Sequence, residues 1–213
     1  MSGASIPFRQ ACRDSTDPPH MSLERHHLHT RTVEYNGYRR NDGLFDIEAE
    51  LRDVRHYDTQ VAEKGLLHAG TAVHHMSITA TVDEQLTVRS ITSRMQSTPF
   101  GFCREVEDSL QPMVGVRMGQ GWRRAITERV GGVAGCTHLR ELLVNMATAA
   151  LQTLPTWQAQ SRLRAGDPAV CRGERPHYLG QCHSWKLDGP VVMKHLPQFF
   201  QPQEPAGATP AQE

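Results

Sequence analysis

The sequence predicts an α+β domain, in which two or three helices pack on one face of an antiparallel sheet of about four strands. Two observations lead to this fold class. Between His29 and Met95, apolar and polar residues alternate in runs that turn residues separate, as in strands that bury one face. After Pro99, apolar residues instead recur every three or four positions, which is the helical period. Strands first and helices second are typical of this class.

The strands are expected as two hairpins. The runs 29–40 and 44–57 flank Asn41-Asp42-Gly43, a strong hairpin-turn signal. The runs 72–82 and 85–95 form the second pair. In the first pair, three apolar residues of run 44–57 alternate with charged ones: Ile47, Ala49 and Leu51. In the second pair, one face of run 72–82 carries His74, Met76, Ile78, Ala80 and Val82.

Three helices are expected after the strands. The first carries a stripe with Cys103 at its edge, formed by Phe102, Val106, Leu110 and Met113. The stretch 121–132 is a short second helix that ends at glycines. The third is a core helix that we expect Pro155 to stop. Its apolar stripe contains Leu139, Leu142, Leu143, Met146, Ala147, Ala150, Leu151 and Leu154.

Length and composition favour one domain between two tails. Residues 1–25 and 201–213 lack a hydrophobic period and are expected to be disordered, which leaves a single domain over 26–200 with a wrapping extension at 166–200. Acidic and basic residues balance at 23 each, so there is no strong nucleic-acid signal. No run reaches the roughly 20 apolar residues of a membrane span, and no secretory signal is visible, so we expect a cytoplasmic protein.

The five cysteines do not resemble a secreted disulfide framework, because they are odd in number and widely scattered. In a reducing compartment they are buried thiols, metal ligands or nucleophiles. They are Cys12, Cys103, Cys136, Cys171 and Cys182.

The segment GGVAGCTHLRELL, residues 131–143, places a thiol and an imidazole at the start of the core helix. Unpaired backbone N–H groups there favour a thiolate, so Cys136 could ligate a metal or attack a substrate, with His138 beside it. Cys136 could equally be a small buried hydrophobe. The glycines could admit a phosphate, but no lysine follows in P-loop position.

A metal site is the sharper interpretation of this segment. We expect His74, Cys103 and Cys136 to lie near the interface of sheet and helices, with His138 or Cys182 as a fourth ligand. Such donors suit zinc or an iron–sulfur cluster. A second polar site around the first hairpin is an alternative, although a charged strand face and a turn explain it as well. Its residues are Arg31, Arg39, Arg40, Asp42 and Asp46.

Several segments together resemble an uncharacterised bacterial family of unknown function over about residues 28–200. They are HTRT, YRRNDGLFDIEAEL, HHMSITATVD, GWR, GCTHLRELL, CHSW and DGPVV. This resemblance implies a bacterial cytoplasmic protein and supplies no activity.

Residues 75–155 are also distantly similar to iron–sulfur cluster scaffold proteins of the NifU/IscU type. By this resemblance, Cys103 matches the second cysteine ligand and Cys136 the third, while His74 stands near the first ligand loop. The first cysteine and the Cys-Gly-Asp motif of the scaffold are missing. The resemblance therefore implies a zinc-bearing relative more readily than a cluster scaffold.

Three functional hypotheses remain open. The first is a metal-binding protein that uses His74, Cys103, Cys136 and His138. The second is an enzyme with the Cys136 thiolate as nucleophile and His138 or His74 as base. The third is an accessory module that binds a partner protein and whose cysteines only pack.

Overall fold

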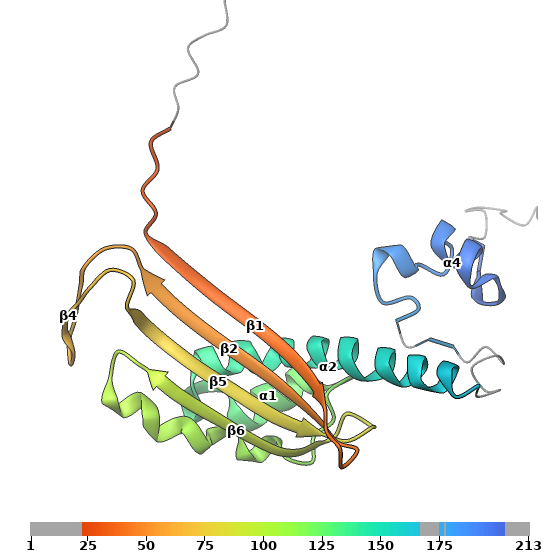
Figure 1. Ribbon diagram of the computed structural model, residues 1–213, viewed down its shortest axis with the longest axis horizontal. Coiled ribbons are helices and arrows are strands. Elements are labelled where there is room, and N and C mark those ends of the chain that lie inside the picture. The colour runs from red at the N-terminus through yellow and green to blue at the C-terminus, as the bar shows by residue number, and fades with distance from the viewer. Residues whose placement is uncertain (1–22, 167–174, 177, 203–213) are drawn as a thin grey trace, which may run out of the picture.

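The predicted four-stranded antiparallel sheet and its helices are present in the structure, a computed structural model (Figure 1). The structure describes residues 23–166, 175–176 and 178–202. The sheet has the order β1-β2-β5-β6, and all neighbouring strands are antiparallel. Its strands are β1 (His29–Arg39), β2 (Phe45–Arg55), β5 (Ala72–Val82) and β6 (Val88–Ser97). Both predicted hairpins are confirmed.

The register sets polar residues side by side at one end of the sheet. Arg31 of β1 lies opposite Asp53 of β2, and Asp53 lies opposite His74 of β5. The pairing then shifts, so that the next residue of β2, Val54, lies opposite Ala72. Val73 is thus the extra residue of a β-bulge.

A short hairpin between β2 and β5 was not predicted. It consists of β3 (Thr59–Val61) and β4 (Gly65–Leu67), which form a separate two-stranded sheet. Strands of three residues are too short to display an alternation of apolar and polar residues, so the sequence carries no periodic signal for them.

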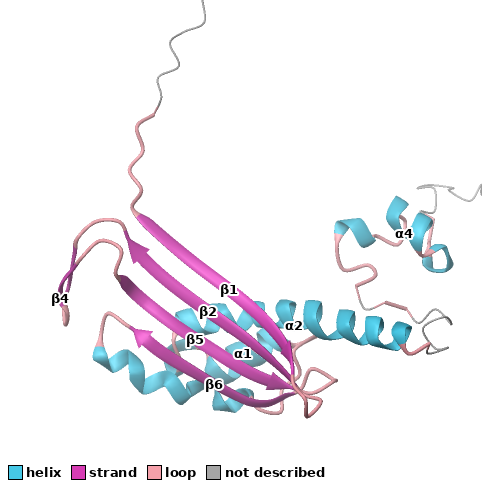
Figure 2. Cartoon of the chain, in the orientation of Figure 1, coloured by secondary structure: helices cyan, strands magenta, loops and turns pink. Residues whose placement is uncertain are grey.

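The helices lie on one face of the sheet (Figure 2). They are η1 (Gly101–Met113), α1 (Trp122–Val130), η2 (Gly132–Ala134) and α2 (Thr137–Arg164). Two details correct the sequence prediction. The first helical segment, η1, is a 3₁₀ helix whose Phe102 is exposed. Helix α2 continues through Pro155 to Arg164. The fixed φ of proline is compatible with a helix, and the costs of Pro155 are one missing backbone hydrogen bond and a steric clash with the preceding turn.

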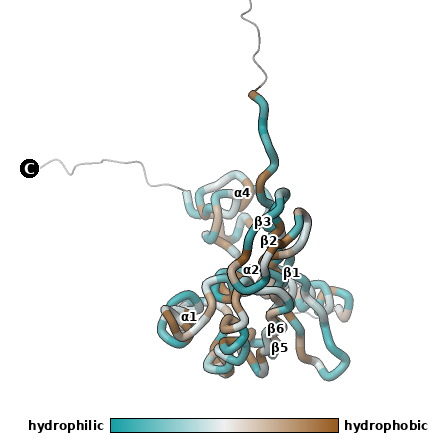
Figure 3. The backbone as a smooth tube through the Cα atoms, turned by 90° about the vertical axis from the view of Figure 1, so that its left-hand side faces the viewer, coloured by the Kyte–Doolittle hydropathy of each residue, from teal (hydrophilic) through white to brown (hydrophobic). Residues whose placement is uncertain are grey.

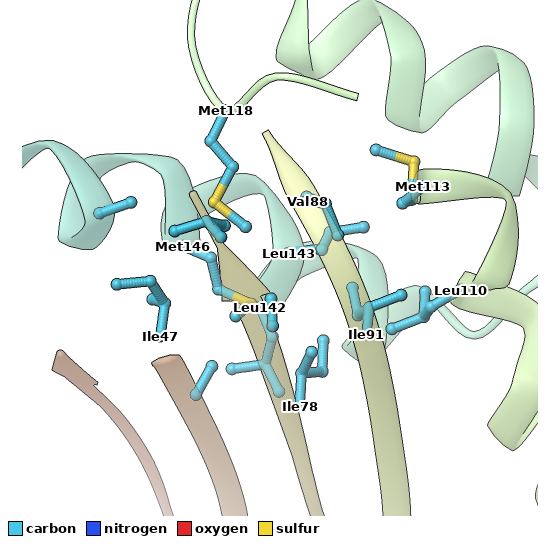
Figure 4. Packing of buried hydrophobic residues seen from close by; sticks show 14 of the residues in the cluster. Ile47, Ile78, Val88, Ile91, Leu110, Met113, Met118, Leu142, Leu143 and Met146 are labelled. Carbon is cyan, nitrogen blue, oxygen red and sulfur yellow. The ribbon is translucent and has the colours of Figure 1, made fainter. Parts of the chain in front are cut away.

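The core fills the space between the sheet and the helices (Figure 4). Side chains of β2, β5 and β6 meet those of η1 and α2 there, and the predicted alternation and stripe account for most of them. Figure 4 labels Ile47, Ile78, Val88, Ile91, Leu110, Met113, Met118, Leu142, Leu143 and Met146, all of which are buried. Figure 3 shows hydrophilic and hydrophobic residues mixed along the chain, as expected of elements that bury one side only.

The C-terminal segment contains η3 (His183–Trp185), α4 (Pro190–His195) and η4 (Pro197–Phe199). α4 contacts η3 and η4, and Val192 is buried. The expectation that 166–200 wraps around the domain stays a prediction. Residues 1–22 and 203–213, which make up most of the two predicted disordered tails, lie outside the described residues. Among the described helices, none combines the length and hydrophobicity that a membrane crossing requires.

Candidate functional site

Three side chains from three separate elements converge at the end of the sheet where α2 begins. They are Asp53 of β2, His74 of β5 and His138 in the first turn of α2. One carboxylate oxygen of Asp53 and one ring nitrogen of each histidine all lie within 4.8 Å of one another. Asp53 is only 4% exposed, and both histidines are partly buried. We call these three residues the Asp–His cluster.

The strand alternation and the start of α2 explain this placement. The residues of β2 that face the helices are Phe45, Ile47, Ala49 and Leu51, and Asp53 is the next position on that face. Two contacts hold the start of α2 against β1: Arg31 Nη1 donates to Glu141 Oε2 at 2.9 Å, and the Tyr35 hydroxyl donates to the carbonyl of Leu142 at 3.2 Å.

Asp53 is the centre of a polar network. Arg31 donates to both carboxylate oxygens at 2.8 Å, from Nε to Oδ1 and from Nη2 to Oδ2. His29 Nε2 lies 3.1 Å from Oδ1, and His74 Nδ1 lies 3.1 Å from Oδ2. Burial raises the pKa of Asp53, but hydrogen bonding to Arg31 and its charge lower it by more, so the pKa falls to about 2. Asp53 is therefore a carboxylate at neutral pH.

The two histidines of the cluster lie against each other, with ring centroids 4.2 Å apart. Burial and the charge of His138 lower the pKa of His74 despite the opposing effect of Asp53. A hydrogen bond with Cys136 raises the pKa of His138 and outweighs the effect of burial. His138 Nε2 faces Asp53 Oδ2 at 3.9 Å. A neutral His74 offers a nitrogen lone pair, as metal binding requires.

Cys136 lies at the other nitrogen of His138. Its Sγ is 3.8 Å from His138 Nδ1, and the residue is the N-cap of α2. Burial raises the pKa of the Cys136 thiol, but His138 and the backbone N–H groups of Leu139 and His138 lower it by more. Cys136 therefore contacts the cluster from the side that faces away from Asp53.

The structure brings together part of the predicted ligand set. His74 and His138 meet, and Cys136 contacts His138. Cys103 is partly buried in η1 and packs against the core, and Cys182 is exposed next to η3. Among the described residues, no ligand group includes Cys103, Cys136 or Cys182, so the predicted roles of these cysteines as ligands gain no support. Asp53 was missed, although its inward position follows from the alternation of β2.

The polar residues of the first hairpin mostly serve its turn. Arg40 pairs with Asp42 at 2.7 Å and with Asp46 at 3.5 Å, and Arg39 stacks over Trp157 at 4.5 Å. These contacts favour the interpretation as a charged strand face and a turn. Arg31 differs from these residues because it belongs to the network around Asp53.

A cavity of about 290 Å³ adjoins the Asp–His cluster. It is lined by His29, Asp53, Arg55, Val73 and His74. Two imidazole nitrogens and one carboxylate oxygen are suitable ligands for a divalent transition metal, and three protein ligands leave coordination positions open to water or a substrate. The arrangement could therefore hold a metal that a small molecule in the cavity can reach.

Comparison with known proteins identifies a family but no function. Searches of curated proteins and of solved structures give no significant match. One family profile, described as "Protein of unknown function (DUF2889)", matches residues 29–152, which include the whole sheet and the Asp–His cluster. This match confirms the predicted membership in an uncharacterised family and leaves the likeness to NifU/IscU scaffolds without support. The chain belongs to the DUF2889 family of proteins of unknown function.

Proposed function

We propose that this protein binds one divalent transition-metal ion through Asp53, His74 and His138. The observation that carries the proposal is the convergence of these three ligand atoms within 4.8 Å, from three elements, beside a cavity. Metal–ligand bonds of roughly 2.0–2.2 Å place neighbouring ligand atoms about 3.4 Å apart. The distances from Asp53 Oδ2 to His74 Nδ1 and His138 Nε2, 3.1 and 3.9 Å, are close to this spacing.

The donor set favours zinc or iron(II) over an iron–sulfur cluster. Iron–sulfur clusters are held mainly by cysteine thiolates, whereas the cluster offers two imidazoles and a carboxylate, with only Cys136 near them. Structural zinc sites use four protein ligands, and sites with two histidines and one carboxylate keep positions open. We therefore assign the metal to binding or activating a small molecule rather than to stabilising the fold.

Zinc titration of metal-free protein against a competing chelator tests the proposal, together with elemental analysis of protein purified without a metal-affinity tag. His74→Ala is expected to weaken zinc binding by roughly a hundredfold or more, since it removes a ligand. The matched control is His75→Ala. His75 is the next residue of β5, and its Nε2 pairs with Glu50 Oε1 at 2.6 Å, away from the cluster. Equal zinc affinity of the two variants would overturn the proposal.

The contact between Cys136 and His138 favours a second candidate, a thiol-dependent enzyme. The sulfur lies at the start of a long helix and 3.8 Å from an imidazole, an arrangement that suits a nucleophile beside its base. Alkylation with iodoacetamide at neutral pH, followed by mass spectrometry, tests it, with the partly buried Cys103 as internal reference. Fast modification of Cys136 that His138→Gln slows supports this candidate, and a rate equal to that of Cys103 contradicts it.

The third hypothesis is an accessory module with structural cysteines. It is supported if the protein neither binds zinc nor shows fast alkylation of Cys136. In that case Cys136→Ser would change the stability of the protein and neither zinc binding nor any reaction rate.

A further inference from the structure

Arg55 extends the polar end of β2 beyond Asp53. It is the next residue on the same face of the strand, it is partly buried, and it is one of the residues that line the cavity. His29, which lies directly opposite Arg55 in the register, lines the cavity as well. In the part of the chain that the structure describes, the guanidinium of Arg55 has no hydrogen bond and no ion pair.

Among the residues that the structure describes, Arg55 has no ion-pair partner of its own at the cavity. The carboxylates of the network, Asp53 and Glu141, are both bonded to Arg31, and their charges balance those of Arg31 and Arg55 together. A divalent metal at the cluster would make this end of the sheet positively charged. A partly buried cation without an ion pair is unfavourable, and an anion bound in the cavity would compensate its charge.

The cavity also limits the size and nature of that anion. About 290 Å³ is at the lower end of the range for small-molecule pockets. Val73 adds an apolar residue to the otherwise polar and charged lining. The forked guanidinium of an arginine matches a carboxylate or a phosphate through two parallel hydrogen bonds. A small organic acid fits all three features.

We propose that the ligand of this cavity is a small organic anion whose carboxylate or phosphate group pairs with Arg55 beside the Asp–His cluster. This inference rests on the proposed function, because it places the anion next to the metal. It goes further by giving the chemical class of the ligand and the residue that selects it.

The test is an NMR titration of the zinc-loaded full chain at pH 7 with propionate, inorganic phosphate and the neutral analogue propionamide. Propionate is expected to bind saturably and propionamide at least roughly tenfold more weakly, since only the anion pairs with the guanidinium. Tighter binding of phosphate than of propionate would assign a phosphate head group, and the reverse a carboxylate.

Two arginine variants distinguish a specific contact of the anion with Arg55 from a general effect of positive charge on anion affinity. Arg55→Gln is expected to weaken anion binding by roughly tenfold or more. Arg52→Gln removes the same charge from the same strand, but Arg52 is exposed on the opposite face, so its affinity should stay within roughly twofold of wild type. If Arg55→Gln does not fold, Arg55→Lys takes its place, with an expected loss of roughly threefold or more because lysine lacks the fork.

The inference is overturned if the Arg55 variant binds propionate as tightly as Arg52→Gln, or if propionamide binds as tightly as propionate. Failure of the metal proposal is distinguishable. In that case wild-type protein does not bind zinc, whereas the titrations on metal-free protein still report whether anion binding depends on Arg55. Arg55→Gln should leave zinc affinity within roughly threefold of wild type, because Arg55 is not a ligand.

Discussion

Two buried aspartates near opposite ends of β5 have different kinds of partner. Asp53 is 4% exposed and lies opposite His74 near the start of β5, and Asp83 is 8% exposed and follows its last residue. Asp83 Oδ1 accepts hydrogen bonds from the backbone N–H groups of Gln85 and Thr87. Asp53 accepts its hydrogen bonds from side chains, namely those of Arg31, His29 and His74.

The difference separates a structural carboxylate from one that can exchange its partners. Backbone N–H groups cannot leave Asp83 without opening the turn, where Leu86 already adopts a positive φ of 66°. The donors around Asp53 are side chains, which can rotate, so Asp53 can exchange a hydrogen-bond partner for another ligand without opening the backbone. Burial is therefore common to both aspartates, and the difference between them is whether their hydrogen-bond donors belong to the backbone or to side chains.

The largest expected effect is on zinc affinity. Asp53→Ala should weaken zinc binding by roughly a hundredfold or more, because it removes the only anionic ligand of the cluster. Asp83→Ala should leave it within roughly twofold, since the two carboxylates lie at different ends of the sheet. Competition with a zinc chelator measures both affinities. A similar loss in the two variants would break the comparison.

Next in size is the effect of Asp83 on stability. Asp83→Ala should lower the free energy of unfolding by about 2 kcal/mol, because two turn N–H groups lose their acceptor. Urea unfolding of the metal-free protein measures this loss. Glu84→Ala, at the exposed neighbouring residue, should change the free energy by no more than about 0.5 kcal/mol. If Glu84→Ala cost as much as Asp83→Ala, the turn bonds of Asp83 would not be what stabilises the protein.

A smaller effect should appear in the pH dependence of stability. Burial raises the pKa of Asp83, but hydrogen bonds from Thr87 and Gln85 lower it by more, so its pKa lies below the ordinary 3.8. A lowered pKa stabilises the fold above pH 3.8, and this contribution is lost as pH falls through the folded-state pKa. The stability of wild type relative to Asp83→Asn should therefore stay constant above pH 5 and decline below about pH 4.

Urea unfolding between pH 6 and 2.5, with chelator present, follows that decline. Asparagine preserves an acceptor oxygen for the turn, so the two proteins should share one fold. A stability gap that grows as the pH falls would contradict the assigned direction of the pKa shift.

The smallest effects concern the two arginines that pair with these aspartates. Arg89 is largely exposed where it meets Asp83 at 2.6 Å, so Arg89→Gln should cost less than about 1 kcal/mol. Arg31 donates to both oxygens of Asp53 and also bonds Glu141, so Arg31→Gln should cost more, about 1–2 kcal/mol. Thermal unfolding ranks the two, and the reverse order would show that Arg31 does not anchor Asp53.

Most of the fold could be predicted from the sequence because it depends on periodicity. The alternation in β2 and β5 and the stripe of α2 each report which side of an element is buried. Periodicity does not report hydrogen-bond geometry, so the 3₁₀ character of η1 was missed. It also does not predict whether a helix crosses a proline such as Pro155.

The candidate site was only partly predictable for a related reason. Alternation placed His74 on the correct face and the helical stripe placed His138 on its flank, but neither says how far along the sheet a residue lies. The position of a residue along the sheet depends on the strand register and on where α2 starts. Together these place Asp53 and Arg31 beside the histidines, whereas Cys103 lies in η1. The alternation of β2 places Asp53 on the inward face, but a single carboxylate has no spacing pattern that marks it as a ligand.

The β-bulge in β5 allows two consecutive residues to line the cavity. In a regular strand, neighbouring residues point to opposite faces, yet Val73 and His74 both line the cavity. The extra residue of the bulge therefore belongs to the lining, so the cavity depends on the number of residues in the strand as well as on their side chains. Deleting Val73 would restore a regular pleat and remove its side chain from the lining, which makes chain length itself a determinant of what this protein can accept.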